Sequence, residues 1–355
     1  MLNSLIFVMH EHKLIKIILY FLVIVFLIIG IWGIDTYKKA YVANIRMKDK
    51  FQYISIPTGS DYENVLAIFK KAGILINPQT FNWCAKRKNY PRHVHPGRYK
   101  IKNRMSNNQL IVMLRAGLQE PVKLTFNNIR FLSQLAKRIS GIIEADSASI
   151  MALFQDEAFI GQYGFDINTV KGMFIPNTYE FWWNTDARSF FIKMQEEYEK
   201  FWNHERTEKL SEIGLTRNEV STLASIVEEE TRKDDEKARI TGVYMNRLKK
   251  GIRLQADPTI KYALGNFNIQ RIRKNHLDVK SPYNTYTHAG LPPGPIRIPS
   301  IKSIDAVLNY EKNDYLYFCA KDDFSGYHVF AKTLAQHNRN ARLYQRALSR
   351  RRIYK

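Results

Sequence analysis

The feature that most constrains this chain is an uninterrupted apolar segment near the N-terminus. Residues 17–34 read IILYFLVIVFLIIGIWGI, eighteen positions without a charge. At about 1.5 Å per helical residue the run spans about 27 Å, close to the hydrocarbon thickness of a bilayer. It has no polar face, unlike a soluble core helix, and no small-residue cleavage site follows it. The sequence predicts an uncleaved transmembrane helix at 17–34 behind a short cytoplasmic tail at 1–16. Lysines lie on both sides of it, so local charge does not fix its orientation.

The chain is strongly basic, with 54 Lys+Arg against 33 Asp+Glu and a net charge of +21. This excess of positive charge bears on which partners the protein binds and not on its fold. Nucleic acid, acidic lipid headgroups and an anionic cell-wall polymer all fit it, and a merely solvated basic surface remains open. The densest stretch contains no acid and comprises Arg339, Arg342, Arg346, Arg350, Arg351, Arg352 and Lys355. Two cysteines, Cys84 and Cys319, exclude a disulfide-rich scaffold.

Two folded regions are predicted after the apolar segment, with a polar link at 38–50 before the first. In the first region, 51–117, we expect strands at 51–56 and 97–101 and helices at 62–72, 78–88 and 106–117, with Ser60 as a helix cap. This order outlines a small LysM-like α/β module that binds glycan, although a structural linker domain is an alternative. The second region, 122–348, mixes strands at 122–126, 315–320 and 328–330 with helices at 130–143, 148–154, 187–202, 218–232 and 234–250. The predicted fold class is α+β.

Three consecutive glutamates, Glu228, Glu229 and Glu230, lie near the end of the helix predicted at 218–232. At 3.6 residues per turn, Glu230 continues the apolar stripe of that helix, formed by Leu223, Ile226 and Val227. We therefore expect only Glu230 to be desolvated, with the raised pKa that suits a general acid. The alternative is a solvated acidic helix end, with Glu230 paired to Arg232 or Lys233.

Polar loops with aromatic residues follow this helix. They read RLQADPT at 253–259, SPYNTY at 281–286 and GLPPGP at 290–295. Rings stack on sugar faces and amides bind hydroxyl groups, so these loops are typical of a glycan groove, although each could be a packed connector.

Together these motifs resemble the YceG-like family, the endolytic murein transglycosylases (MltG). The resemblance rests on ASIVEEET at 224–231, NRL at 246–248, RLQADPT, YNTY at 283–286 and GLPPG at 290–294, with YLYF at 315–318 and HVF at 328–330. It implies that Glu230 is the catalytic glutamate and that Glu228 supports it. Candidates for binding glycan or orienting Glu230, with structural roles equally open, are Asn246, Gln255, Asp257, Tyr283 and Asn284.

The resemblance also implies the reaction and its setting. The expected activity is non-hydrolytic cleavage of the β-1,4 bond between N-acetylmuramic acid and N-acetylglucosamine, which leaves 1,6-anhydro ends and terminates nascent strands. No cofactor or metal is expected. The expected partners are peptidoglycan glycan strands, the inner membrane and peptidoglycan synthases, with the catalytic domain periplasmic. Two departures from the family pattern are Asn177, where an Asp is common, and the pair Asn127-Asn128, where Glu-Gly is common.

Other functions remain open from the residues alone. A lysozyme-like hydrolase would use Glu230 with Asp257. A membrane-anchored wall-binding protein would bind glycan without cleaving it. Nucleic-acid binding is suggested only by charge, without a motif, and is not expected. A zinc site formed by His288, His328 and His337 lacks close ligand spacing and is not expected either.

Overall fold

The computed structural model describes residues 2–351, and the side chains of 16–351, as a mixed α+β protein in two units. The N-terminal unit runs to Val122 and includes Trp182–Asn184, and the C-terminal unit holds Lys123–Phe181 and the residues from Thr185 on. The predicted α+β class is confirmed, as is the apolar N-terminal helix.

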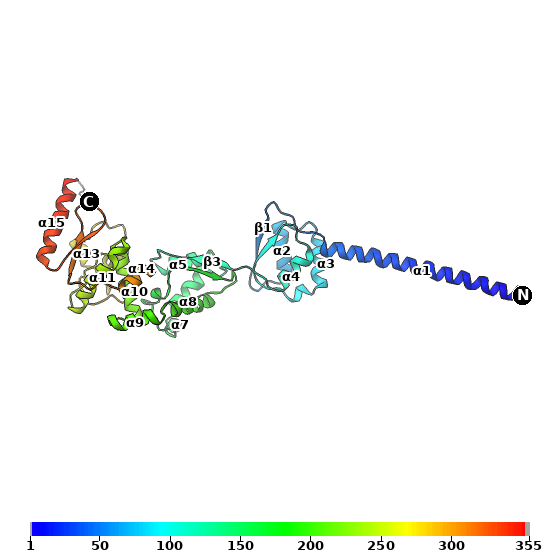
Figure 1. Ribbon diagram of the computed structural model, residues 1–355, viewed down its shortest axis with the longest axis horizontal. Coiled ribbons are helices and arrows are strands. Elements are labelled where there is room, and N and C mark those ends of the chain that lie inside the picture. Colours follow the sequence, from blue (N-terminus) through cyan, green and yellow to red (C-terminus); the bar gives the residue numbers. More distant parts are fainter. Residues whose placement is uncertain (1, 352–355) are drawn as a thin grey trace. The chain divides into compact units, whose positions relative to one another are not determined.

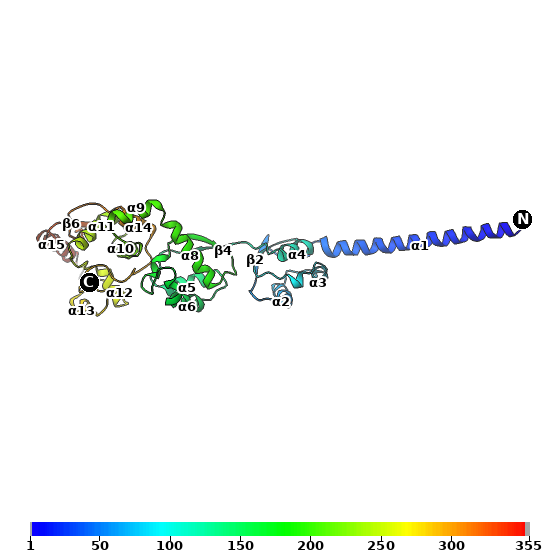
Figure 2. The same ribbon diagram turned by 90° about the horizontal axis from the view of Figure 1, so that it is seen from below.

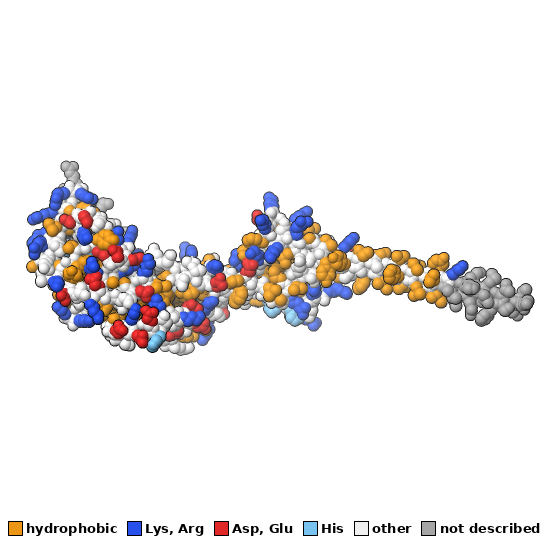
Figure 3. Space-filling model, viewed as in Figure 1, with side chains coloured by type: hydrophobic (Ala, Val, Ile, Leu, Met, Phe, Trp, Pro, Cys, Tyr) orange, Lys and Arg blue, Asp and Glu red, His pale blue; other side chains and the backbone are white. Residues whose placement is uncertain are grey.

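The first element is the long helix α1, Leu2–Tyr41 (Figure 1). Its part Lys16–Tyr41 is long and apolar enough to cross a membrane. Large apolar side chains cover the described surface of this helix (Figure 3), and Phe26 is 76% exposed. The helix extends beyond the predicted residues 17–34, and its last turn packs against α3 and α4, with Ala40 buried.

The N-terminal unit is a two-stranded antiparallel sheet with helices. Its elements are β1 (Phe51–Ile56), α2 (Tyr62–Ala72), α3 (Pro78–Arg87), the 3-10 turn η1 (Tyr90–Arg92), β2 (Gly97–Lys102) and α4 (Asn107–Arg115). The register pairs Phe51 with Lys102 and Ile56 with Gly97. The predicted helix cap is displaced by one residue, because Asp61 rather than Ser60 accepts the hydrogen bond from the Asn64 amide.

The polar link predicted at 38–50 is wrong, since these residues form part of this unit. Tyr41 ends α1, Ile45 is 1% exposed, and the backbone at Ala43 and Ile45 forms bridges to Ser106 and Leu75. The Asn44 side chain is buried and donates to the carbonyl oxygen of Asn77. Polar composition was misleading here because the backbone and a buried amide make the contacts.

The C-terminal unit contains two small sheets among many helices. Its strands are β3 (Val122–Thr125, whose first residue belongs to the N-terminal unit) paired with β4 (Thr178–Phe181), and β5 (Tyr317–Ala320) paired antiparallel with β6 (His328–Ala331). Its helices are α5 (Leu132–Ser140), α6 (Ser147–Gln155), α7 (Glu157–Gly161), the 3-10 turn η2 (Val170–Met173), α8 (Ala187–Phe201), α9 (His204–Ile213), α10 (Arg217–Glu230), α11 (Asp234–Lys249), α12 (Asp257–Ala263), α13 (Lys274–Leu277), α14 (Ile301–Leu308) and α15 (Leu334–Arg350). Helix α6 packs against both α5 and α8, and the three helices lie in the same part of the unit (Figure 2).

Helix α10 is the central element of this unit. A capping box between Thr216 and Glu219 begins it, and every residue from Val220 to Val227 is buried. It packs against α11, α12 and α14. Its last residue is Glu230, and Thr231 continues in extended conformation. The C-terminal end of α10 lines two cavities that it forms with the neighbouring elements.

Candidate active site

Glu230 lies in a cavity of about 370 Å³. The cavity is formed by the C-terminal end of α10, the C-terminal half of α11, the start of α12 with the loop before it, a second loop at Tyr286, strand β5 and the first turn of α15. Its lining comprises Glu230, Tyr244, Arg247, Leu254, Gln255, Asp257, Tyr286, Tyr317, Phe318, Leu334 and His337. Three of the predicted site residues, Glu230, Gln255 and Asp257, therefore meet in one place. We call this space the Glu230 cavity.

The carboxyl group of Glu230 has a neutral hydrogen-bond partner. The Tyr244 hydroxyl, on α11, donates to Glu230 Oε1 at 2.5 Å. Burial raises the pKa of Glu230 to about 7, the Tyr244 hydrogen bond partly offsets this, and the nearby charge of Asp257 raises it again. Burial also raises the pKa of Tyr244 well above its usual value, so this hydroxyl remains a donor. The predicted raised pKa of Glu230 thus has a physical basis in the structure, and Arg232 and Lys233 are not its partners.

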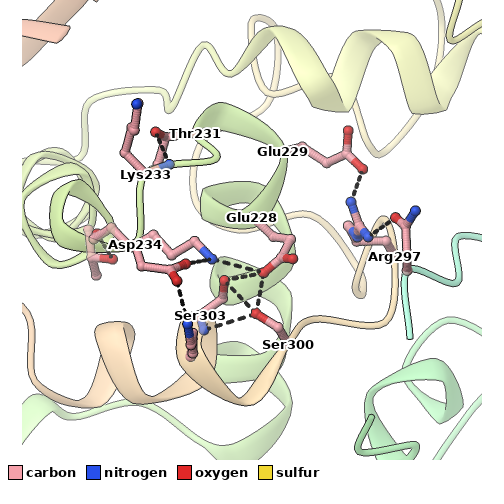
Figure 4. A network of polar contacts seen from close by, with 12 residues as sticks. Glu228, Glu229, Thr231, Lys233, Asp234, Arg297, Ser300 and Ser303 are labelled. Carbon is pink, nitrogen blue, oxygen red and sulfur yellow. Dashed lines mark hydrogen bonds and ion pairs between the residues drawn. The ribbon is translucent and has the colours of Figure 1, made fainter. Parts of the chain in front are cut away.

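The prediction that only Glu230 is desolvated is wrong, because all three glutamates at the end of α10 are half-buried. Their partners distinguish them. Glu229 accepts from Arg130 at 2.7 Å and from Arg297 at 2.6 Å, so two cations compensate its charge (Figure 4).

The negative charge of Glu228 is also compensated, by groups on the opposite side of α10 from the Glu230 cavity. It accepts hydrogen bonds from the Ser300 hydroxyl at 2.5 Å and from the Ser303 hydroxyl, and Lys237 Nζ lies at 3.4 Å (Figure 4). Burial acts to raise the pKa of Glu228, but the two serine hydrogen bonds and the charges of Lys237 and Arg297 together lower it. Glu228 is therefore held ionised, whereas Glu230 is poised to carry a proton near neutral pH.

One wall of the Glu230 cavity presents Gln255 and Asp257. The backbone of Gln255 has φ 50°, a left-handed conformation that is rare outside glycine and is characteristic of functional sites. Its amide donates to the Thr285 carbonyl oxygen at 3.0 Å. Asp257 begins α12 and accepts from the Tyr286 hydroxyl at 2.6 Å. The wall thus combines aromatic rings with amide and carboxylate oxygens, which suits a sugar ring.

The buried Arg247 holds two parts of this cavity together. Its guanidinium donates to the carbonyl oxygen of Leu254 at 2.8 Å and to that of Leu316 at 2.6 Å. It thereby fixes the loop before α12 to the chain that enters β5. The His337 ring stacks on Tyr317 with centroids 5.4 Å apart.

Three predicted residues lie outside this cavity, in addition to Glu228. Asn246 donates to the carbonyl oxygens of Asn313 and Tyr315. Asn284 is fully buried and donates to the carbonyl oxygens of Leu277, the last residue of α13, and of Val279. Tyr283 packs on the Tyr262 ring at 4.8 Å. The hydrogen bonds of Asn246 and Asn284 to backbone are a structural role, which was one of the two open alternatives for these side chains.

Sequence reasoning did not identify Tyr244 as the partner of Glu230. It also missed the other lining residues, which are Arg247, Leu254, Tyr286, Tyr317, Phe318, Leu334 and His337. Five of these residues lie within motifs that carry the family resemblance, so a signal for them existed: Arg247, Leu254, Tyr286, Tyr317 and Phe318. No local pattern marks Tyr244, which meets Glu230 only through the packing of α11 on α10.

The departures from the family pattern also have places in the structure. Asn127 and Asn128 line a second cavity beside the end of α10. The Asn177 carbonyl oxygen accepts from the Phe126 amide, and its side chain accepts from the Thr178 amide. Within residues 16–351, no group of three or more His, Cys, Asp or Glu side chains is arranged to hold a metal ion. Both cysteines are free thiols.

Comparison with known proteins shows the family. The model of the YceG-like family matches residues 54–343. The chain is 30% identical over 335 residues to an endolytic murein transglycosylase of Bacillus subtilis (strain 168), covering 88% of this chain and 90% of that protein. It is 31% identical over 322 residues to an endolytic murein transglycosylase of Streptococcus pneumoniae serotype 2 (strain D39 / NCTC 7466), covering 82% of this chain and 58% of that protein.

A solved structure agrees with these relatives. The crystal structure of a YceG-like protein from Listeria monocytogenes aligns with a TM-score of 0.54 and 28% identity, covering 82% of this chain and 98% of that one. The names of the curated relatives match the enzyme class predicted from the sequence, a peptidoglycan lytic transglycosylase. The extent of these matches confirms the predicted resemblance, and the chain belongs to the YceG-like family.

Proposed function

We propose that this protein is a membrane-anchored endolytic transglycosylase of peptidoglycan, with Glu230 as its acid and base. The observation that carries the proposal is a glutamate with a pKa of about 7, bonded to a neutral tyrosine, in a cavity of rings and polar side chains. Such a group is protonated in a large fraction of molecules at neutral pH and can also act as a base.

The chemistry follows from the two states of this carboxyl group. Protonated Glu230 donates its proton to the oxygen that leaves when the bond between N-acetylmuramic acid and N-acetylglucosamine breaks. The resulting carboxylate accepts the proton of the muramoyl 6-hydroxyl, whose oxygen closes the 1,6-anhydro ring. No water is consumed, and Glu230 ends protonated again. Because the nucleophile belongs to the substrate, one carboxyl group suffices.

The neighbours of Glu230 support both states. The Tyr244 hydroxyl donates to the carboxylate and stabilises it after the proton has left, while burial favours the protonated form before the reaction. Gln255 and the rings of Tyr286 and Tyr317 are placed to contact sugar.

A lysozyme-like hydrolase is the second candidate, because Asp257 lines the same cavity as Glu230. Mass spectrometry of glycan digested by the full-length protein distinguishes the two. Anhydromuramoyl ends support the transglycosylase, and reducing muramic acid ends would establish the hydrolase instead. Absence of any cleavage would support a wall-binding protein.

For the remainder of the chain we propose the predicted organisation. Residues 17–34 cross the inner membrane once, with 1–16 cytoplasmic, a LysM-like glycan-binding module at 51–117 and a catalytic domain at 122–348 outside. Termination of nascent strands beside peptidoglycan synthases is the proposed role. Protease added to spheroplasts should then remove the C-terminal unit, and full protection would contradict this topology.

A further inference from the structure

A second cavity, of about 610 Å³, lies beside the end of α10. Glu228, Glu229 and Arg232 line it from α10 and the residues that follow, Asn128 lines it from the loop after β3, and Arg297 lines it from the segment before α14. We call it the Arg297 cavity. Glu229 belongs to this cavity and Glu230 to the other, and adjacent Cα atoms are about 3.8 Å apart. The last turn of α10 therefore forms a wall of both cavities.

The Arg297 cavity is built around a buried guanidinium. The Arg297 side chain is only 10% exposed and donates to Glu229 and to the Asn128 side-chain oxygen (Figure 4). Its Nε has no hydrogen-bond partner within the described part of the chain. Asn128 itself has φ 51°, a left-handed conformation. Asparagine adopts this conformation readily, so the observation that indicates a ligand is the incompletely satisfied buried cation in the lining of a polar cavity.

The acids of this cavity are already compensated by the fold. Glu229 binds Arg130 and Arg297, and Glu228 binds two serines and Lys237. Asp234, the third acid, is bonded by Lys237 at 2.9 Å and by Lys302 at 2.6 Å.

By contrast, Arg232 is exposed and forms no ion pair with any residue from 16 to 351. The cavity thus has an excess of positive charge, and amide donors from Asn127 and Asn128 lie beside it. Guanidinium groups and amides in this arrangement match carboxylate oxygens.

We propose that the Arg297 cavity binds a carboxylate of the stem peptide on the glycan strand whose bond is cleaved at Glu230. This proposal rests on the proposed function, since it identifies which part of the peptidoglycan the protein recognises. A peptide projects from every second sugar of such a strand, so a site next to the catalytic carboxyl group is within its reach. The anionic peptide places the strand, and the Glu230 cavity performs the chemistry.

The test uses full-length protein in detergent micelles and two soluble ligands. One is a muramoyl peptide with free carboxylates, and the other is the same compound with those carboxylates converted to amides. Calorimetric titration should show that the wild-type protein binds the free acid about tenfold more tightly, as expected for one charge-assisted hydrogen bond. Arg232→Gln should abolish this preference, and Arg297→Gln should do the same if it folds. The matched control is Arg346→Gln, which removes an exposed arginine of α15 and should keep the preference.

Equal binding of the two ligands by the wild-type protein would overturn the proposal. So would a preference that survives in Arg232→Gln. This readout does not depend on cleavage. A charge preference without anhydromuramoyl products would therefore refute the proposed function and leave this site standing, whereas cleavage without the preference would do the reverse.

Discussion

Replacing Glu230 by Gln should stabilise the protein above neutral pH while removing its activity. The folded-state pKa of Glu230 is about 7, against an ordinary value of 4.5. Between these values the folded state binds more protons than the unfolded state, so the stability contributed by this group falls as pH rises from 4.5 through 7. A difference of about 2.5 pKa units at about 1.4 kcal/mol per unit amounts to about 3 kcal/mol. Gln keeps an oxygen that accepts from Tyr244 but never ionises, so it avoids this loss.

Thermal unfolding between pH 4 and pH 9 measures the effect on full-length protein. For a unit of 150–250 residues, about 3 kcal/mol corresponds to roughly 6–12 °C. The wild-type protein and Glu230→Gln should therefore unfold at similar temperatures at pH 4, and the variant at a higher temperature by up to that amount at pH 8. Anhydromuramoyl product should fall by at least about 10²–10⁴-fold, the usual contribution of a general acid and base.

Glu229→Gln is the matched control, one residue away on the same helix. It removes the charge that compensates Arg130 and Arg297, so it should lower the unfolding temperature at pH 8. If Glu230→Gln is no more stable than wild type at pH 8, or if its advantage is the same at pH 4, the inferred desolvation of Glu230 is incorrect. Retention of wild-type turnover would refute its catalytic role.

Three further predictions concern the surroundings of Glu230. Tyr244→Phe removes the hydrogen bond that lowers the pKa of Glu230, so the alkaline limb of the pH profile of kcat/KM should move to higher pH. An unchanged pH profile would show that Tyr244 does not act on this carboxyl group. Glu228→Gln should be less stable than wild type above about pH 4.5, because a carboxyl group with a lowered pKa stabilises the folded state there. That stabilisation is lost as pH falls, so the unfolding temperatures of the variant and wild type should converge in acid. Unlike Glu230→Gln, the variant should keep measurable turnover. Gln255→Gly places glycine at a left-handed backbone conformation, so the unfolding temperature should not fall. KM for glycan should rise, because the side chain that lines the cavity is removed. A lower unfolding temperature with unchanged KM would assign Gln255 a structural role.

Local pattern was sufficient to predict much of the N-terminal unit and of α10. Strand β1 and helix α2 have the predicted bounds, because alternation and helical spacing of apolar residues are local properties. The same spacing placed Glu230 on the buried stripe of α10. Short helices of one or two turns were missed, among them α12 and α13, because so few residues show no clear periodicity.

Burial of the three glutamates shows where local pattern fails. A helix projection describes the faces of one helix, but α10 is packed on several sides, so Glu228 and Glu229 are half-buried as well. Their different chemistry depends on which side chains approach from elsewhere. Serines and a lysine reach Glu228, two arginines reach Glu229, and a tyrosine reaches Glu230.

The sequence by itself therefore determined that an apolar helix precedes an α+β protein and that Glu230 lies on a buried stripe. The tertiary structure decided that the partner of Glu230 is the neutral Tyr244, fourteen positions later on another helix. It also decided that Gln255 and Asp257 line the Glu230 cavity, whereas the side chains of Asn246 and Asn284 donate hydrogen bonds to backbone carbonyl oxygens. The physical reason is that the pKa of a buried carboxyl group depends on the charge of the groups in contact with it, and these contacts arise from non-local packing of helices and loops.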